Sequence, residues 1–111
     1  MEVKKRTVGE VTVVSVLGDL DGRSAPAAQD RLLGLIPSGG RVLIDMTGVP
    51  YMSSAGLRTM LLVYRRAQAV NGAIALAGVS PELRSVMSAT GFLEFFTISD
   101  TVRRGIEELR A

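Results

Sequence analysis

The chain has 111 residues and a net charge of +2, and its 47% hydrophobic and 22% charged residues are typical of one globular domain. It contains no histidine and no cysteine, which excludes a Ser-His-Asp triad, a cysteine nucleophile, a disulfide framework and the usual zinc ligands. Its basic residues are scattered and lack interleaved aromatics, so nucleic-acid binding is not favoured. No apolar run reaches the length of a membrane span, and the N-terminus lacks the apolar region of a signal peptide. We therefore expect a cytoplasmic protein without membrane insertion.

The first half of the chain predicts two strands, a helix and a third strand. Residues 11–17, VTVVSVL, are β-branched and apolar, which is typical of a strand, and residues 3–8 are expected to pair with them through a tight turn. Ser24 is placed to cap a helix over about residues 24–36, which the PSGG run then ends. Residues 41–46, RVLIDM, are almost continuously apolar, as in a strand that is covered on both faces.

The second half of the chain alternates helices and strands. Ser80, Pro81 and Glu82 form a helix start, and Ser99 or Asp100 is expected to cap the last helix. We expect, in chain order, a helix over about residues 54–70, a strand over 73–77, a helix over about 80–90, a strand over 95–98 and a helix that reaches Arg110.

The order of these elements predicts the fold class. Strands that alternate with helices indicate an α/β fold with a mixed, mostly parallel sheet of about four to five strands and about four helices, with the first strand antiparallel at an edge. We expect a single domain over residues 1–111. In such sheets the functional groups gather in the loops after the carboxyl ends of the strands, which here are residues 18–22 and 47–54.

The second of these loops leads into YMSSAGL, residues 51–57, where a strand gives way to a helix. Helix capping explains a serine at such a junction, and from the residues alone it explains either Ser53 or Ser54. A catalytic serine is disfavoured, because the chain has no imidazole and its only lysines, Lys4 and Lys5, lie near the N-terminus. We therefore expect a protein that is not an enzyme.

Two stretches of sequence carry a resemblance to a known family. LIDMTGVPYMSSAGL combines a strand that ends in Asp45 with a short loop and a Ser-Ser-x-Gly-Leu helix start, and Gly91-Phe92 precedes the last strand. Upstream, GDLDGRSAPAAQDRL fits the first loop and helix of the same family. From about Val3 to Leu109 the chain resembles the STAS domain, named after sulphate transporters and anti-sigma factor antagonists. The resemblance implies a STAS-like fold and a free-standing bacterial anti-sigma factor antagonist that needs no cofactor and no metal.

In that family the unphosphorylated antagonist binds a cytoplasmic serine protein kinase, which is itself the anti-sigma factor. Phosphorylation of a serine at the helix start switches the antagonist off, and a PP2C-type phosphatase resets it. The resemblance implies that Ser54 is the phosphoacceptor, with Ser53 as the alternative acceptor, since Ser53 stands where the family usually has aspartate. It implies a monomer or weak homodimer with these partner-binding residues: Asp21, Met52, Ser53, Gly56 and Leu57.

The residues leave other interpretations open. A STAS-like domain can also be a constitutive accessory or scaffold subunit of a membrane transport or signalling complex. This alternative stays open because Ser53 stands where the family usually has aspartate. Nucleotide or lipid binding is a third class, although residues 18–22 lack the spacing and the lysine of a phosphate-binding loop. Taken alone, Asp21 is typical of a loop acid that stabilises a turn. Asp45 is typical of an acid that accepts N–H groups beyond its strand, and Arg58 is typical of a solvated helix face.

Overall fold

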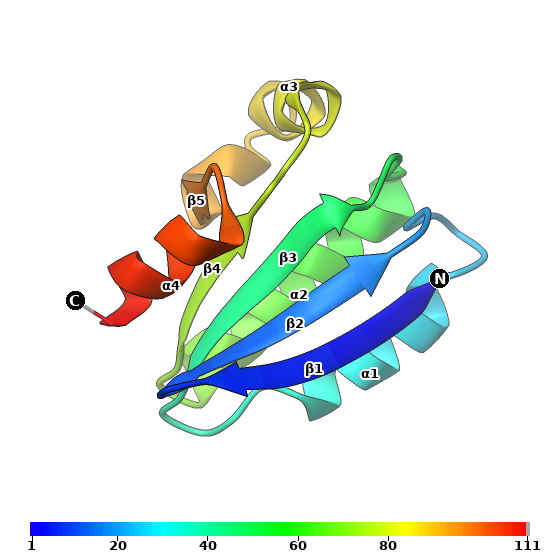
Figure 1. The fold of residues 1–111 in the computed structure, drawn as a ribbon. Helices are drawn as coiled ribbons and strands as arrows, with labels where there is room; N and C mark the ends of the chain where they lie inside the picture. The colour runs from blue at the N-terminus through cyan, green and yellow to red at the C-terminus, as the bar shows by residue number, and fades with distance from the viewer. Residues whose placement is uncertain (111) are drawn as a thin grey trace.

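The computed structural model describes residues 1–110, which form a five-stranded sheet with four α-helices and a short 3₁₀ helix (Figure 1). The alternation of strands and helices follows the order predicted from the sequence. The elements are β1 Glu2–Val8, β2 Val11–Leu17, α1 Ala25–Gly34, β3 Arg41–Gly48, α2 Ser54–Ala69, β4 Ala73–Ala77, α3 Pro81–Ala89, the 3₁₀ helix η1 Phe92–Phe95, β5 Thr97–Ser99 and α4 Val102–Arg110.

The five strands lie in the sheet in the same order as in the chain. The edge strand β1 pairs with β2 in an antiparallel register, and β2, β3, β4 and β5 are parallel to one another. The predicted mixed sheet with an antiparallel edge strand is therefore confirmed. Its carboxyl edge receives the loops after β2, β3 and β4, because parallel strands all end at the same side.

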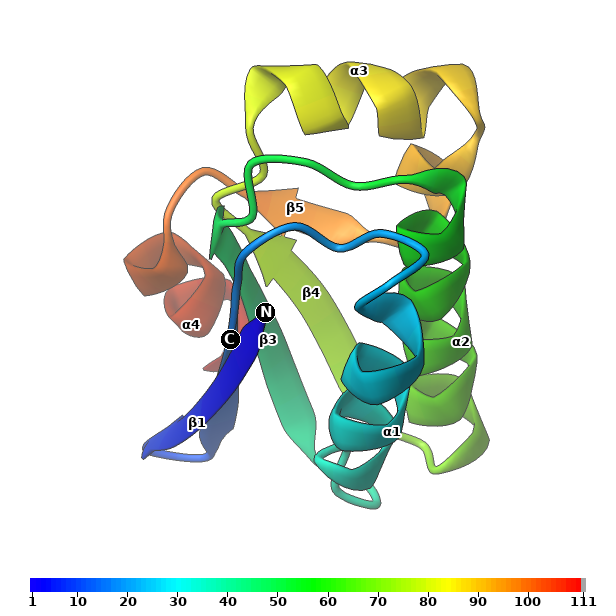
Figure 2. The same cartoon turned by 90° about the vertical axis from the view of Figure 1, so that its right-hand side faces the viewer.

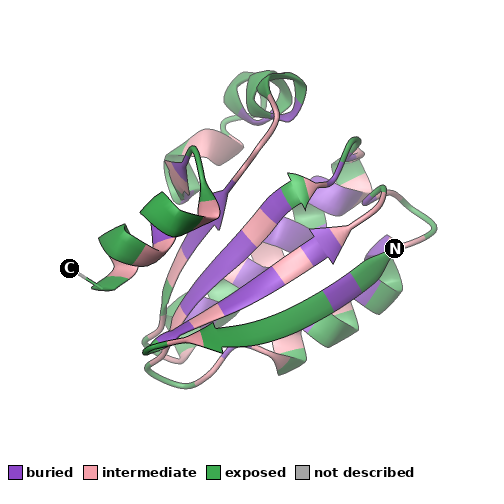
Figure 3. Cartoon of the chain, in the orientation of Figure 1, coloured by how far each residue is buried: buried purple, intermediate pink, exposed green. Residues whose placement is uncertain are grey.

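Helices cover both faces of the sheet, which explains the apolar run of β3. Helices α1 and α2 pack side by side on one face, α4 lies on the opposite face, and α3 crosses above the carboxyl edge (Figure 2). Within β3, Val42 and Ile44 belong to the core beneath α1 and α2, whereas Leu43 packs with the α4 side chains Val102 and Ile106. A central strand thus needs apolar side chains at successive positions, and the buried residues run along β2, β3 and β4 in Figure 3.

The C-terminal quarter differs from the prediction in two places. The strand expected over residues 95–98 begins later, at Thr97, because Phe92–Phe95 forms the 3₁₀ helix after Gly91. The ring of Phe95 packs edge-to-face against Tyr64 of α2 at a centroid distance of 5.6 Å, which favours the helical turn over an extended chain.

The second difference is the cap of α4. Thr101, and neither Ser99 nor Asp100, caps this helix, because its Oγ1 accepts the N–H of Arg104 at 3.1 Å. Ser99 lies within β5, where its hydroxyl is buried and donates to Glu108 at 3.0 Å. Among residues 1–110, no helix is both long and apolar enough to cross a membrane.

Candidate functional site

The loop after β2 is attached directly to the segment that precedes α2. The Leu20 N–H donates to the Tyr51 carbonyl at 2.9 Å, and the Ser53 N–H donates to the Leu20 carbonyl at 3.0 Å. Leu20 and Met52 therefore form an isolated parallel bridge. The sequence predicted that residues 18–22 and 47–54 both lie at the carboxyl edge of the sheet, but it did not predict the bridge between them. Its consequence is that the acids on either side of Leu20 lie beside the start of α2.

The two serines at the start of α2 have different roles in the structure. Ser53 is the N-cap, in an extended conformation, and its Oγ accepts the Gly56 N–H at 3.4 Å. Ser54 is the first residue of the helix and is exposed. Within residues 1–110, no side-chain hydrogen bond engages the Ser54 hydroxyl. Capping by Ser53 is thus confirmed, and it leaves the neighbouring hydroxyl accessible to solvent.

This difference predicts unequal effects of two matched substitutions. Ser53→Ala removes the cap and is expected to lower the free energy of unfolding by about 0.5–2 kcal/mol. Ser54→Ala removes a hydroxyl without a partner and is expected to change stability by no more than about 0.5 kcal/mol. Urea unfolding of the two variants measures both values, and an equal loss in each would contradict the assignment of the cap to Ser53 alone.

Gly56 is required by the close approach of the loop after β2. A Cβ at this position would lie 2.3 Å from the Leu20 carbonyl oxygen and 2.6 Å from the Met52 Cγ. The first of these neighbours is backbone, which cannot swing aside as a flexible side chain can. The glycine in the Ser-Ser-x-Gly-Leu run therefore lets helix α2 and the loop pack together.

The predicted partner-binding residues do not all face outward. Met52 and Leu57 are 3% and 4% exposed, and Gly56 is buried as well. The expectation that these three residues form the contact surface is corrected by their burial. They pack into the core and support the site from beneath. Tyr51 is not among the predicted contact residues, yet its side chain is 53% exposed although it precedes a buried methionine. Alternation along the extended segment was the signal for it.

Asp21 organises the turn between β2 and α1. Its Oδ1 accepts the N–H groups of Arg23 at 2.9 Å and of Ser24 at 3.1 Å, which confirms the expected turn-stabilising acid. The Ser24 hydroxyl donates to the Asp19 carbonyl at 2.8 Å and accepts the Asp21 N–H at 3.0 Å. Ser24 was expected to cap α1, and this is wrong for its side chain, which is engaged by the loop instead.

The hydrogen bonds from the backbone of Ser24 and then of Arg23 hold the pKa of Asp21 below its ordinary value of 3.8. An acid whose folded pKa is depressed stabilises the fold above its unfolded pKa, and this contribution is lost as the pH falls through the folded pKa. We expect the amide shifts of Arg23 and Ser24 to titrate together with a midpoint below 3.8. An NMR pH titration tests this, with Asp21→Asn as the control in which the transition disappears. A midpoint at or above 3.8 would contradict it.

Asp45 has a structural role, but inside its strand. β3 continues to Gly48, two residues beyond the expected end, so the Thr47 N–H that the Asp45 Oδ1 accepts at 3.0 Å belongs to β3 and not to a loop. The Oδ2 accepts the Ser15 hydroxyl at 3.1 Å, and the carboxylate therefore links β3 to the neighbouring strand β2. Among the residues that the structure describes, no cluster of three or more histidine, cysteine, aspartate or glutamate side chains could hold a metal ion.

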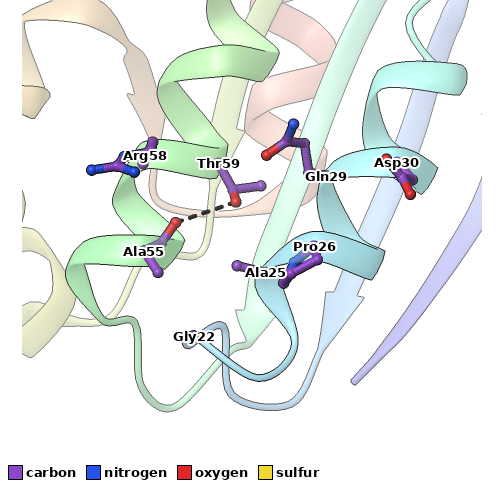
Figure 4. A pocket seen from close by; sticks show the side chains of 8 residues that line it. All are labelled: Gly22, Ala25, Pro26, Gln29, Asp30, Ala55, Arg58 and Thr59. Carbon is purple, nitrogen blue, oxygen red and sulfur yellow. Dashed lines mark hydrogen bonds between the residues drawn. The ribbon is translucent and has the colours of Figure 1, made fainter.

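A shallow depression of about 300 Å³ lies between the N-terminal turns of α1 and α2 (Figure 4). Gly22 and Asp30 line it from the α1 side, and Ala55 and Arg58 line it from α2. Thr59 is almost fully buried and donates its hydroxyl to the Ala55 carbonyl at 3.2 Å. Arg58 is exposed, as expected for a solvated helix face.

Fold and site together define a small α/β domain whose candidate site is a solvent-accessible serine at a helix start, beside an acidic loop. The profile of the STAS domain family matches residues 2–105, and the chain belongs to this family. The anti-sigma-B factor antagonist of Bacillus subtilis is 27% identical over 85% of this chain and 86% of its own length.

Solved structures of the same kind share the fold. An anti-sigma factor antagonist STAS domain protein from Planctomyces limnophilus superposes with a TM-score of 0.90 at 21% identity, over 98% of each chain. The anti-sigma factor antagonist SpoIIAA has a TM-score of 0.74 in its unphosphorylated form, at 23% identity and 99% coverage of both chains. The phosphorylated form of the Bacillus SpoIIAA has a TM-score of 0.72 at 22% identity, over 98% of this chain and 100% of that one.

Proposed function

We propose that this STAS domain is an anti-sigma factor antagonist that is switched by phosphorylation of Ser54. In the unphosphorylated form it binds a serine protein kinase that is also an anti-sigma factor. The kinase transfers the γ-phosphoryl group of ATP to the Ser54 Oγ, with release of ADP and a proton, and this ends the binding. The observation that carries the proposal is the exposed Ser54 hydroxyl at the start of α2, which remains unengaged because Ser53 caps the helix.

The position of Ser54 supports a modification that the fold tolerates. A phosphate adds about −1.5 to −2 charges, and at a helix N-terminus these charges face free N–H groups and the positive end of the dipole. No acidic residue occupies the first turn of α2, so the phosphate would meet no like charge within that turn. The local effect is a stabilisation of about 0.3–1 kcal/mol. Phosphorylation would therefore alter binding without unfolding the domain.

The surroundings of Ser54 support a contact surface for a kinase. Tyr51 is exposed next to the serines, and the Leu20–Met52 bridge holds Asp19 and Asp21 beside them. A partner with basic residues would complement these acids, and a phosphate added to the same surface would bring charge that needs a new cationic partner. We propose Asp21, Ser53 and Ser54 as contact residues, while the buried Met52, Gly56 and Leu57 set the shape beneath them.

Relatives support the same role. The Bacillus subtilis relative is named an anti-sigma-B factor antagonist, and SpoIIAA exists in a phosphorylated and an unphosphorylated form. A reversible switch also needs a phosphatase, for which we propose the PP2C type that the family resemblance implies. We place the switch in the cytoplasm, where ATP and an anti-sigma factor are available.

The proposal is tested by intact mass and peptide mapping of the protein purified from its own cells, grown with and without stress. A single phosphate on Ser54 is expected. A phosphate on Ser53 would keep the mechanism and move the site, and it would also remove the cap of α2. No phosphate under any condition would overturn the switch.

A second function is favoured by one observation, the serine at position 53 in place of the usual aspartate. Without that charge a kinase would have less to select, and the domain would then be a constitutive accessory or scaffold subunit. Copurification distinguishes the two functions. A kinase that binds only the unphosphorylated chain supports the switch, whereas stable association with transporter or scaffold components, without any phosphate, supports the constitutive subunit.

A further inference from the structure

We propose that Arg58 holds a phosphate on Ser54 in place within this chain. Arg58 would act as a positioning residue for the phosphorylated state, so that the phosphate has a cationic partner before any other protein binds. This inference rests on the proposed function, since it takes Ser54 as the phosphoacceptor.

The spacing of the two residues carries the first part of the argument. Ser54 and Arg58 are four residues apart on α2, and both are exposed. Residues at this spacing are neighbours on one helix face, with Cβ atoms about 5–6 Å apart. Helical side chains lean toward the N-terminus, so the Arg58 side chain can reach the turn that begins at Ser54. An anionic group N-terminal to a cationic one is also the more favourable order for such a pair.

The second part is that Arg58 is not committed to another charge. Within residues 1–110 there are five ion pairs, and none of them includes Arg58; their cations are Lys4, Arg41, Arg84, Arg103 and Arg104. Asp30 lines the same depression, but it lies on the opposite side from Arg58 in Figure 4. The first turn of α2 contains no acid either. A phosphate would therefore pair with Arg58 without displacing a carboxylate.

The third part is the chemistry of the guanidinium group. Its planar fork donates two parallel N–H groups to two phosphate oxygens, whereas a lysine offers a single charged point. Pairing favours the dianion over the monoanion, so the second pKa of the phosphate is expected to fall below about 6.

The test uses the full chain with phosphoserine incorporated at position 54 during translation, followed by ³¹P NMR across pH. Arg58→Ala is expected to raise the midpoint of the phosphate titration by about 0.3 unit, which corresponds to the usual strength of a pair at this spacing. Arg58→Lys is expected to give an intermediate midpoint. Arg65→Ala is the matched control, since Arg65 is an exposed arginine of the same helix that lies about three turns from Ser54. This variant is expected to leave the midpoint unchanged.

Equal midpoints in the wild type and in Arg58→Ala would overturn the role of Arg58. A shift of the same size in Arg65→Ala would overturn it as well, because the effect would then come from net charge alone. The phosphate is installed without a kinase, so this result does not depend on whether Ser54 is phosphorylated in cells. Failure of the proposed function would appear separately, as the absence of phosphate on the chain from its own cells.

Discussion

A phosphate on Ser54 is expected to weaken binding of the cognate kinase by about two to three orders of magnitude. Burying a charged group in an interface costs several kcal/mol, and the proposed pair with Arg58 would offset only about 0.2–0.5 kcal/mol of this. A net loss of about 3–4 kcal/mol corresponds to the expected change in Kd. The fold is expected to persist, because Ser54 is exposed and sits at the positive end of α2. Phosphorylation would thus separate the partners while the domain remains intact.

The kinase is first identified as the protein that copurifies with the Ser54→Ala variant. Its Kd is then measured by calorimetry for the unmodified chain and for the chain with phosphoserine encoded at position 54. Phosphoserine at position 38 is the matched control. Ser38 is also exposed, but it lies in the loop before β3, at the opposite edge of the sheet from Ser54. An unchanged Kd with phosphoserine 54, or an equal loss with phosphoserine 38, would contradict a switch that acts through the start of α2.

Replacement of Gly56 by alanine is expected to lower the free energy of unfolding by about 1–3 kcal/mol, which is the usual cost of overpacking. The added methyl group would meet the Leu20 carbonyl oxygen at 2.3 Å, and relief requires the loop after β2 to move away from α2. That movement would break the bridge between Leu20 and Met52. Kinase binding is therefore expected to weaken together with stability.

Gly34→Ala is the matched control for this substitution. Gly34 is the last residue of α1, and a Cβ there would have no heavy atom within 4 Å. The same chemical change is expected to be neutral or to stabilise the protein by up to about 1 kcal/mol through helix propensity. Urea unfolding compares the two variants, and a loss of stability in Gly34→Ala as large as that in Gly56→Ala would show that the packing against Leu20 is not the cause.

The sequence by itself determined the element order and much of the site. Runs of β-branched and apolar residues predicted β2, β3 and β4, with β2 and β4 correct at both ends, because a strand buried on both faces leaves a clear local pattern. The turn chemistry of Asp21 was also predicted, as was a serine cap at position 53 or 54, since such side chains bond to backbone N–H groups two or three residues away. Such interactions are encoded locally.

Only the tertiary structure decided which parts of the site are accessible and what holds them together. The bridge between Leu20 and Met52 joins residues that are distant in sequence, and the need for glycine at position 56 follows from that approach. The burial of Leu57 and the start of β5 at Thr97 likewise depend on packing against other elements. Local patterns specify the conformation of a segment, but the backbone groups that meet across a fold are set by how all the segments pack.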